Sequence, residues 1–179
     1  FAYAVDAARR GKHSARSPLM NVVSNEQLPG IVRATGLSLL GRYAGQGQSQ
    51  DQIQARTQPL RSGLQDADPL VRLGALRGLS ATGAGNWQAL MPLLNDQLRG
   101  LRFAAVSALL PIYPQLPPSA RGRMDTATDE YLEYLTANAD RAESLTSRAL
   151  VHQARGDIKA SEADLLQALQ RNPAWVAVQ

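Results

Sequence analysis

The chain has 179 residues, enough for one ordinary domain or a short array of helical repeats. Hydrophobic residues make up 44% of the sequence and aromatic residues only 5%, which favours helices packed through small side chains over a β-sheet core. The sequence contains no cysteine, which excludes disulfides, thiolate metal sites, cysteine nucleophiles and haem attachment through CxxCH within it, and its apolar stretches are far shorter than the roughly 18–20 residues that span a bilayer.

The net charge of +4 is unevenly distributed along the sequence. Residues 1–125 carry 14 lysines and arginines against 7 acidic residues, whereas residues 126–179 carry 5 against 8. This change from a basic to an acidic portion indicates two modules. Because the basic excess is modest and base-stacking aromatic residues are scarce, it favours a solvated surface over nucleic-acid binding. The densest basic run contains Arg9, Arg10, Lys12, His13 and Arg16.

Helical patterns follow one another along the chain. A helix over residues 1–10 is expected to end at Gly11, and the next begins at Pro18 with Ser17 as its N-cap. Residues 44–49 contain two glycines and predict a loop. The helices predicted next cover residues 28–43, 51–64, 69–81, 86–94, 98–110 and 118–138.

A nine-residue segment recurs in three of these helices. In each copy an aliphatic residue precedes an arginine, and large aliphatic residues stand four and seven places after that arginine. The arginines are 39 and 30 residues apart, an interval typical of stacked helix pairs. Chains built in this way usually present surfaces to partners. The copies are residues 32–40, 71–79 and 101–109, with the arginines Arg33, Arg72 and Arg102.

Two copies also have an aspartate six residues before the arginine. In the first copy, Gln27 has this position before Arg33. Because the spacing recurs with the segment, we expect the arginines to pair with the aspartates and with helix-end carbonyl groups, tying one copy to the next, rather than to bind phosphate or an acidic partner. The two spaced pairs are Asp66 with Arg72 and Asp96 with Arg102.

Residues 18–110 resemble HEAT-type helical repeats. In that family the second helix is often entered through Asp-x-Asp-Pro-x-Val-Arg, and Asp66-Ala67-Asp68-Pro69-Leu70-Val71-Arg72 fits this pattern in full. Asp96 and Arg102 keep its six-residue spacing. The resemblance implies an α-solenoid that offers a surface to other macromolecules.

The stretch from Gly156 to Pro173 resembles the second half of a tetratricopeptide (TPR) repeat, and one full unit extends from about Ala142 to Trp175. The resemblance implies that Leu145, Ala149, His152, Leu165 and Ala168 occupy packing positions. Two residues depart from the family pattern, since Arg148 stands where TPR repeats prefer Leu and Ser161 where they prefer Ala.

The order of these modules resembles the C-terminal region of some bacterial multihaem c-type cytochromes. Those proteins carry their haem sites further upstream, so the resemblance implies no cofactor in this sequence and haem only if sequence upstream of Phe1 carries CxxCH. It also implies a bacterial, periplasmic location; the cytoplasm is the alternative.

These patterns together predict an all-α fold, a right-handed α-solenoid of HEAT-like helix pairs followed by a TPR helix pair. We expect three parts. HEAT-like repeats occupy residues 1–113, a proline-rich junction and a bridging helix occupy residues 114–139, and the TPR unit occupies residues 140–179.

We therefore expect a protein–protein interaction or scaffold module of a larger bacterial protein, which binds a protein or peptide on a helical-repeat surface. The alternatives are an electron-transfer module of a periplasmic multihaem cytochrome and a HEAT-type nucleic-acid binder. The sequence lacks GxSxG, HExxH and GxxxxGK[ST] motifs, so we expect no enzyme and assign no catalytic, cofactor or metal residue. The candidate interaction surface consists of Arg9, Arg10, Lys12, Arg16 and Trp175.

Overall fold

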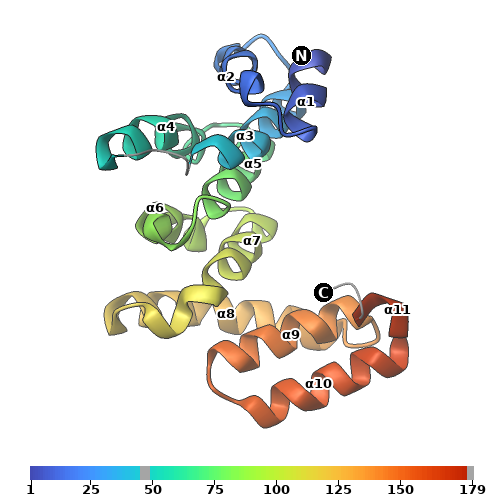
Figure 1. The fold of residues 1–179 in the computed structure, drawn as a ribbon. Helices are drawn as coiled ribbons and strands as arrows, with labels where there is room; N and C mark the ends of the chain where they lie inside the picture. The colour runs from blue at the N-terminus through green and yellow to red at the C-terminus, as the bar shows by residue number, and fades with distance from the viewer. Residues whose placement is uncertain (45–48, 177–179) are drawn as a thin grey trace. The chain divides into compact units, whose positions relative to one another are not determined.

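The computed structural model describes residues 1–44 and 49–176, and side chains for most of them. The described residues form helices and connecting turns without any β-strand, which confirms the all-α fold class (Figure 1). Within the same residues no helix is both long enough and apolar enough to cross a membrane. The α-helices are α1 (Ala2–Arg9), α2 (Arg16–Ser24), α3 (Gly30–Ala44), α4 (Gln50–Gly63), α5 (Pro69–Ser80), α6 (Trp87–Leu90), α7 (Arg99–Leu109), α8 (Pro118–Ala137), α9 (Ala142–Ala154), α10 (Ile158–Arg171) and α11 (Pro173–Val176).

The chain forms two compact units, Phe1–Ala104 and Ala105–Gln179. The predicted division into three parts, with boundaries after residues 113 and 139, stays a prediction, and so does the solenoid arrangement. Part of the predicted loop at 44–49 lies outside the described residues, but Ser49 caps α4 by accepting a hydrogen bond from the Gln52 N–H at 3.3 Å.

Two predicted helix boundaries differ from the structure. A short 3₁₀ turn over His13–Ala15 leads directly into α2, so Ser17 already lies inside the helix and does not cap it. The predicted helix at residues 86–94 is one α-helical turn, α6, followed by a 3₁₀ segment, Met91–Asn95. Pro92 stands at the start of that segment, and its missing N–H prevents continuation of regular α-helical hydrogen bonding.

Sequence signals account well for the start of α5. Asp68 is its N-cap and accepts a hydrogen bond from the Leu70 N–H at 2.8 Å, while Pro69 occupies the first turn, where no intrahelical donor is needed. The large aliphatic residues placed four and seven positions after each recurring arginine are all at most 3% exposed. They are Leu37, Leu40, Leu76, Leu79, Val106 and Leu109.

Helices α3 and α5 lie side by side and approach each other through glycine (Figure 1). A Cβ atom added to Gly74 would overlap the carbonyl oxygen of Ala34, and one added to Gly78 would overlap that of Leu37. A Cβ added to Gly41 would overlap the carbonyl group of Gly78. The two helices therefore run in the same direction with their backbones in contact, at a separation that only residues without a Cβ permit.

In the second unit, α9 and α10 form a helix pair joined by a tight turn. Gly156 has a φ of 84°, and Asp157 then caps α10 by accepting a hydrogen bond from the Ala160 N–H at 3.1 Å. Leu145 and Ala168 belong to the core of this pair, as expected. Leu165 does not belong to this core and is 38% exposed.

An ion pair joins α9 to α10 through Arg148, which stands where TPR repeats prefer Leu. The Arg148 guanidinium donates two hydrogen bonds to the Asp164 carboxylate, at 2.8 and 2.5 Å, and the Asp164 side chain is only 7% exposed. The hydrogen bonds that Arg148 donates to Asp164 raise the pKa of Arg148. This bidentate pair links the two helices through charge-assisted hydrogen bonds.

The glycine contacts make a first prediction. Gly74→Ala or Gly78→Ala should lower the free energy of unfolding by about 1–3 kcal/mol or more, since the added methyl group forces α3 and α5 apart. Gly100→Ala is the control, because nothing lies within 4 Å of a Cβ there and alanine favours the helix. Urea denaturation measures the difference, and equal stability of the three variants would contradict the close contact.

The pair between α9 and α10 makes a second prediction. Asp164→Ala should cost about 3 kcal/mol, because it leaves the Arg148 guanidinium partly buried without its carboxylate. The double variant Arg148→Leu/Asp164→Leu should recover most of this loss, since an apolar contact replaces the pair. Thermal unfolding followed by circular dichroism would test both, and a double variant no more stable than Asp164→Ala would contradict the argument.

Candidate functional site

The recurring arginines of the first unit bond to aspartates across copies of the segment. Arg33 contacts the Asp66 carboxylate at 2.5 Å, and Arg72 contacts the Asp96 carboxylate through two hydrogen bonds, at 2.9 and 3.1 Å. Each of these two arginines therefore pairs with an aspartate of the next copy, the one that stands six residues before the arginine of that copy. The result is a short ladder of ion pairs that we call the arginine–aspartate ladder.

The six-residue spacing corresponds to a different bond. Arg72 donates to the backbone carbonyl oxygen of Asp66 at 2.8 Å, and Arg102 donates to that of Asp96, also at 2.8 Å. Asp66 shows the pattern: its backbone carbonyl accepts a hydrogen bond from Arg72, six residues later, and its carboxylate pairs with Arg33 from the preceding copy. The carboxylate bonds join a helix to the turn before a later helix, and the carbonyl bonds join a helix to the turn before itself, so these arginines are engaged within the fold.

Local backbone geometry orients the two aspartates. The Asp66 carboxylate accepts the Asp68 N–H, and that of Asp96 accepts the Leu98 N–H, each at 2.9 Å. Burial alone would raise the pKa of both carboxyl groups, but these N–H bonds and the guanidinium groups of Arg33 and Arg72 outweigh it and lower each pKa below the ordinary value of 3.8. Both carboxyl groups are therefore negatively charged at neutral pH.

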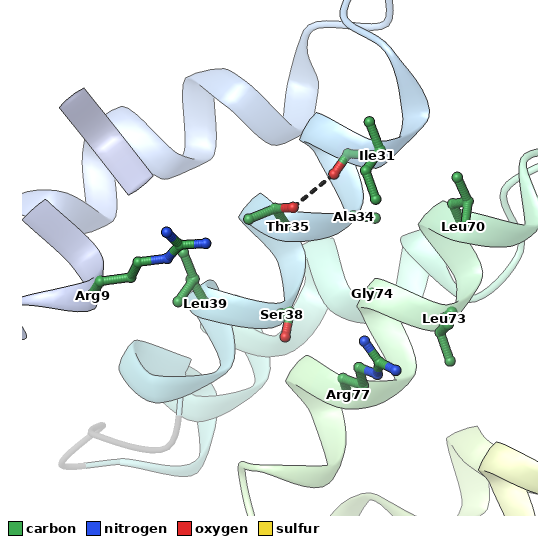
Figure 2. Close-up of a pocket in the computed structure, with 10 residues that line it drawn as sticks. All are labelled: Arg9, Ile31, Ala34, Thr35, Ser38, Leu39, Leu70, Leu73, Gly74 and Arg77. Atoms are coloured by element: carbon green, nitrogen blue, oxygen red, sulfur yellow. Dashed lines mark hydrogen bonds between the residues drawn. The ribbon is translucent and has the colours of Figure 1, made fainter. Parts of the chain in front are cut away.

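A groove lies beside this ladder in the first unit, and we call it the α3–α5 groove. Its volume is about 330 Å³, and it is formed by side chains from α1, α3 and α5 (Figure 2). Aliphatic, small, hydroxyl and cationic side chains line it, and none of them is acidic. The lining residues are Arg9, Ile31, Ala34, Thr35, Ser38, Leu39, Leu70, Leu73, Gly74 and Arg77.

The two arginines of the groove differ from those of the ladder. Arg9 comes from α1 and Arg77 from α5, so they approach the exposed ridge of α3 from its two sides (Figure 2). Both side chains are exposed, and neither makes a hydrogen bond or ion pair with any described residue. Between them, Thr35 donates its hydroxyl hydrogen to the Ile31 carbonyl oxygen at 2.7 Å. The groove thus presents two unpaired positive charges.

The residues proposed from sequence as an interaction surface do not share one place. Arg9 lines the groove, whereas Arg10 forms an exposed ion pair with Asp6 at 3.1 Å. Lys12 is exposed on the turn after α1, and its carbonyl oxygen accepts the hydroxyl hydrogen of Tyr43 at 3.0 Å. The other two are Arg16, which is the first residue of α2, and Trp175, whose side chain lies outside the described residues.

Arg77 is the groove residue that sequence reasoning missed. It stands five places after Arg72, where the other two copies of the segment have Ser38 and Ser107. The presence of a large cationic residue where the other copies have serine could have marked Arg77 as a candidate functional residue. Its meaning depends on Arg9, which is far away in sequence and meets the same groove only in the folded chain.

No group of histidine and acidic residues suited to a metal ion occurs in the described part of the chain. The expectation that this chain is no enzyme and holds no cofactor stays a prediction. Comparisons with protein families, with curated proteins and with solved structures found no match.

The lowered pKa values of Asp66 and Asp96 make a prediction about pH. A carboxyl group whose pKa is lower in the folded state stabilises the fold fully above its unfolded value of 3.8 and loses that effect as the pH falls through the folded value. Asp96→Asn should therefore cost about 2 kcal/mol at neutral pH, and its difference from the wild type should shrink below about pH 4.

Thermal unfolding of both proteins across this range measures the effect. The exposed Asp140→Asn variant is the control and should follow the wild type at every pH. A difference between Asp96→Asn and the wild type that stays constant down to pH 2 would show that ionisation of Asp96 does not support the fold.

Proposed function

We propose that this chain is a protein–protein interaction module of a larger bacterial protein, and that it binds an extended segment of a partner in the α3–α5 groove. Its architecture in this proposal is an α-solenoid of HEAT-like helix pairs followed by a TPR unit. The contact between α3 and α5 and the arginine–aspartate ladder both support stacking of successive copies. A periplasmic location is part of the same proposal and rests on the order of the modules.

The observation that carries the proposal is the lining of the groove. Ile31 is 58% exposed and Leu70 45% exposed, so both leave aliphatic surface in water that a bound side chain could cover. Ala34 and Gly74, both buried where α3 contacts α5, also line the groove. Hydroxyl groups and two arginines offer polar contacts beside this apolar surface, a combination typical of peptide-binding surfaces.

A nucleic acid fits the groove less well than a peptide. Its phosphates would match Arg9 and Arg77, but the exposed aliphatic surface of Ile31 and Leu70 would gain nothing from a sugar–phosphate backbone. Single-stranded nucleic acids bind to aromatic side chains by stacking, and the groove lining contains none. Nucleic-acid binding is accordingly an alternative outcome of the experiment below.

Blocking the groove tests the proposal. Ser38 lies between Thr35 and Arg77 in Figure 2, so Ser38→Trp should fill the groove without entering the core. Peptides selected from a random library on the wild-type chain should bind this variant at least about tenfold more weakly. Ala55→Trp is the matched control, because Ala55 is also a small side chain on a helix, exposed on α4 outside the groove lining.

Two results would contradict the proposal. One is a set of selected peptides that binds wild type, Ser38→Trp and Ala55→Trp equally, because the groove would then play no part. The other is a duplex or single-stranded oligonucleotide that binds more tightly than any selected peptide and loses affinity in Ser38→Trp. Circular dichroism of each variant checks that the helices are intact.

A further inference from the structure

We infer that the segment bound in the α3–α5 groove is acidic and carries an aliphatic residue close to its carboxylates. This inference rests on the proposed function and names the chemistry of the partner. It depends on three properties of the groove: its arginines are unpaired, its apolar and charged residues follow one another in a fixed order along α5, and the distance between Leu70 and Arg77 is known.

The charge of the groove is uncompensated. The ladder arginines Arg33 and Arg72 each meet a carboxylate within the fold, whereas Arg9 and Arg77 meet none among the described residues. None of the ten lining residues is acidic. Asp6, which lies close by on α1, is already paired with Arg10. Carboxylates of a bound segment would therefore supply the missing partners.

The groove also has a direction. Because α3 and α5 run in parallel, their first turns lie at the same end, and both present an exposed aliphatic residue there, Ile31 and Leu70. Two turns further along α5 the groove wall is Arg77. Along α5 a bound segment thus meets the aliphatic side chain of Leu70 before the positive charge of Arg77, which favours an aliphatic residue and an acidic residue in a fixed order.

The geometry of the helix sets their spacing. Leu70 and Arg77 are seven residues apart on α5, which corresponds to about 10 Å along the helix axis at about 1.5 Å per residue. An extended peptide advances about 3.3 Å per residue. The aliphatic residue and the carboxylate that meets Arg77 should therefore be about two to four residues apart. A further carboxylate can reach Arg9 on the opposite side of α3.

The arginines are exposed, so each ion pair should contribute modestly and weaken in salt. Partial burial beneath a bound segment strengthens these pairs, because water is then excluded from one side. Selectivity for acidic over neutral segments should consequently be moderate and larger at low ionic strength.

Fluorescence anisotropy of labelled synthetic peptides on the full chain tests the inference. The first probe has one leucine followed by glutamates two and four residues later in a Gly/Ser background, and the second has glutamine in place of each glutamate. We expect the acidic probe to bind about tenfold more tightly than the neutral one at low salt. Arg9→Gln and Arg77→Gln should each remove about threefold to tenfold of this affinity, and the double variant should remove the preference for the acidic probe.

Arg42→Gln is the matched control. It removes an exposed arginine of α3 that does not line the groove and whose side chain bonds to no described residue, so affinity for the acidic probe should not change. The side chains of Arg9 and Arg77 make no hydrogen bond or ion pair with a described residue, so thermal unfolding should be unchanged in both variants. An effect of Arg42→Gln equal to that of Arg77→Gln would reduce the result to net charge and overturn the inference.

Failure of the inference can be told apart from failure of the proposed function. If the neutral probe binds as tightly as the acidic one and both are lost in Ser38→Trp, the groove binds peptides but does not select carboxylates. If neither probe binds while library-selected peptides do bind in a manner sensitive to Ser38→Trp, the inference alone is overturned. If no peptide shows sensitivity to Ser38→Trp, both are overturned. An oligonucleotide that binds more tightly than any peptide and loses affinity in Ser38→Trp also overturns both.

Discussion

The contact between the backbones of α3 and α5 is the constraint on which the first unit depends. It exists because Gly41, Gly74 and Gly78 have no Cβ atoms, so carbonyl groups of one helix occupy the space where side chains of the other would be. Large aliphatic residues on the same helices, Leu37 and Leu76 among them, are then buried beside this contact. Small residues on these helices therefore let the two backbones come into contact, and large residues on the same helices fill the core beside that contact.

The arginine–aspartate ladder follows from the same contact. Once α3 and α5 are adjacent and parallel, the first turns of both helices lie at one end, where Arg33 can reach Asp66. The next step joins Arg72 to Asp96 in the same way. Each aspartate is held by a backbone N–H, so the geometry of the pair is fixed by the turn as well as by the charges. The ladder positions helices and leaves its own arginines unavailable to a ligand.

The groove is a consequence of this arrangement on the exposed side of the helices. Small buried residues at the contact, Ala34 and Gly74, line it together with larger side chains of α1, α3 and α5. Arg77 stands in a position that is serine in the other two copies, and Arg9 comes from a helix outside the recurring pattern. The fold therefore holds Arg33 and Arg72 in ion pairs, whereas Arg9 and Arg77 bond to no described residue and can meet an anion.

The sequence by itself determined the helical fold class, the start of α5 at Asp68 and Pro69, and the burial of the aliphatic residues that follow each recurring arginine, because helix capping and helical periodicity are local properties. It also pointed to aspartate as the partner of arginine. Only the tertiary structure decided which aspartate pairs with which arginine, that Arg148 bonds to Asp164, and that Arg9 and Arg77 line one groove. These pairings join residues of different helices and turns, so they depend on the register in which helices pack, and that register is set by backbone contacts that no local pattern specifies.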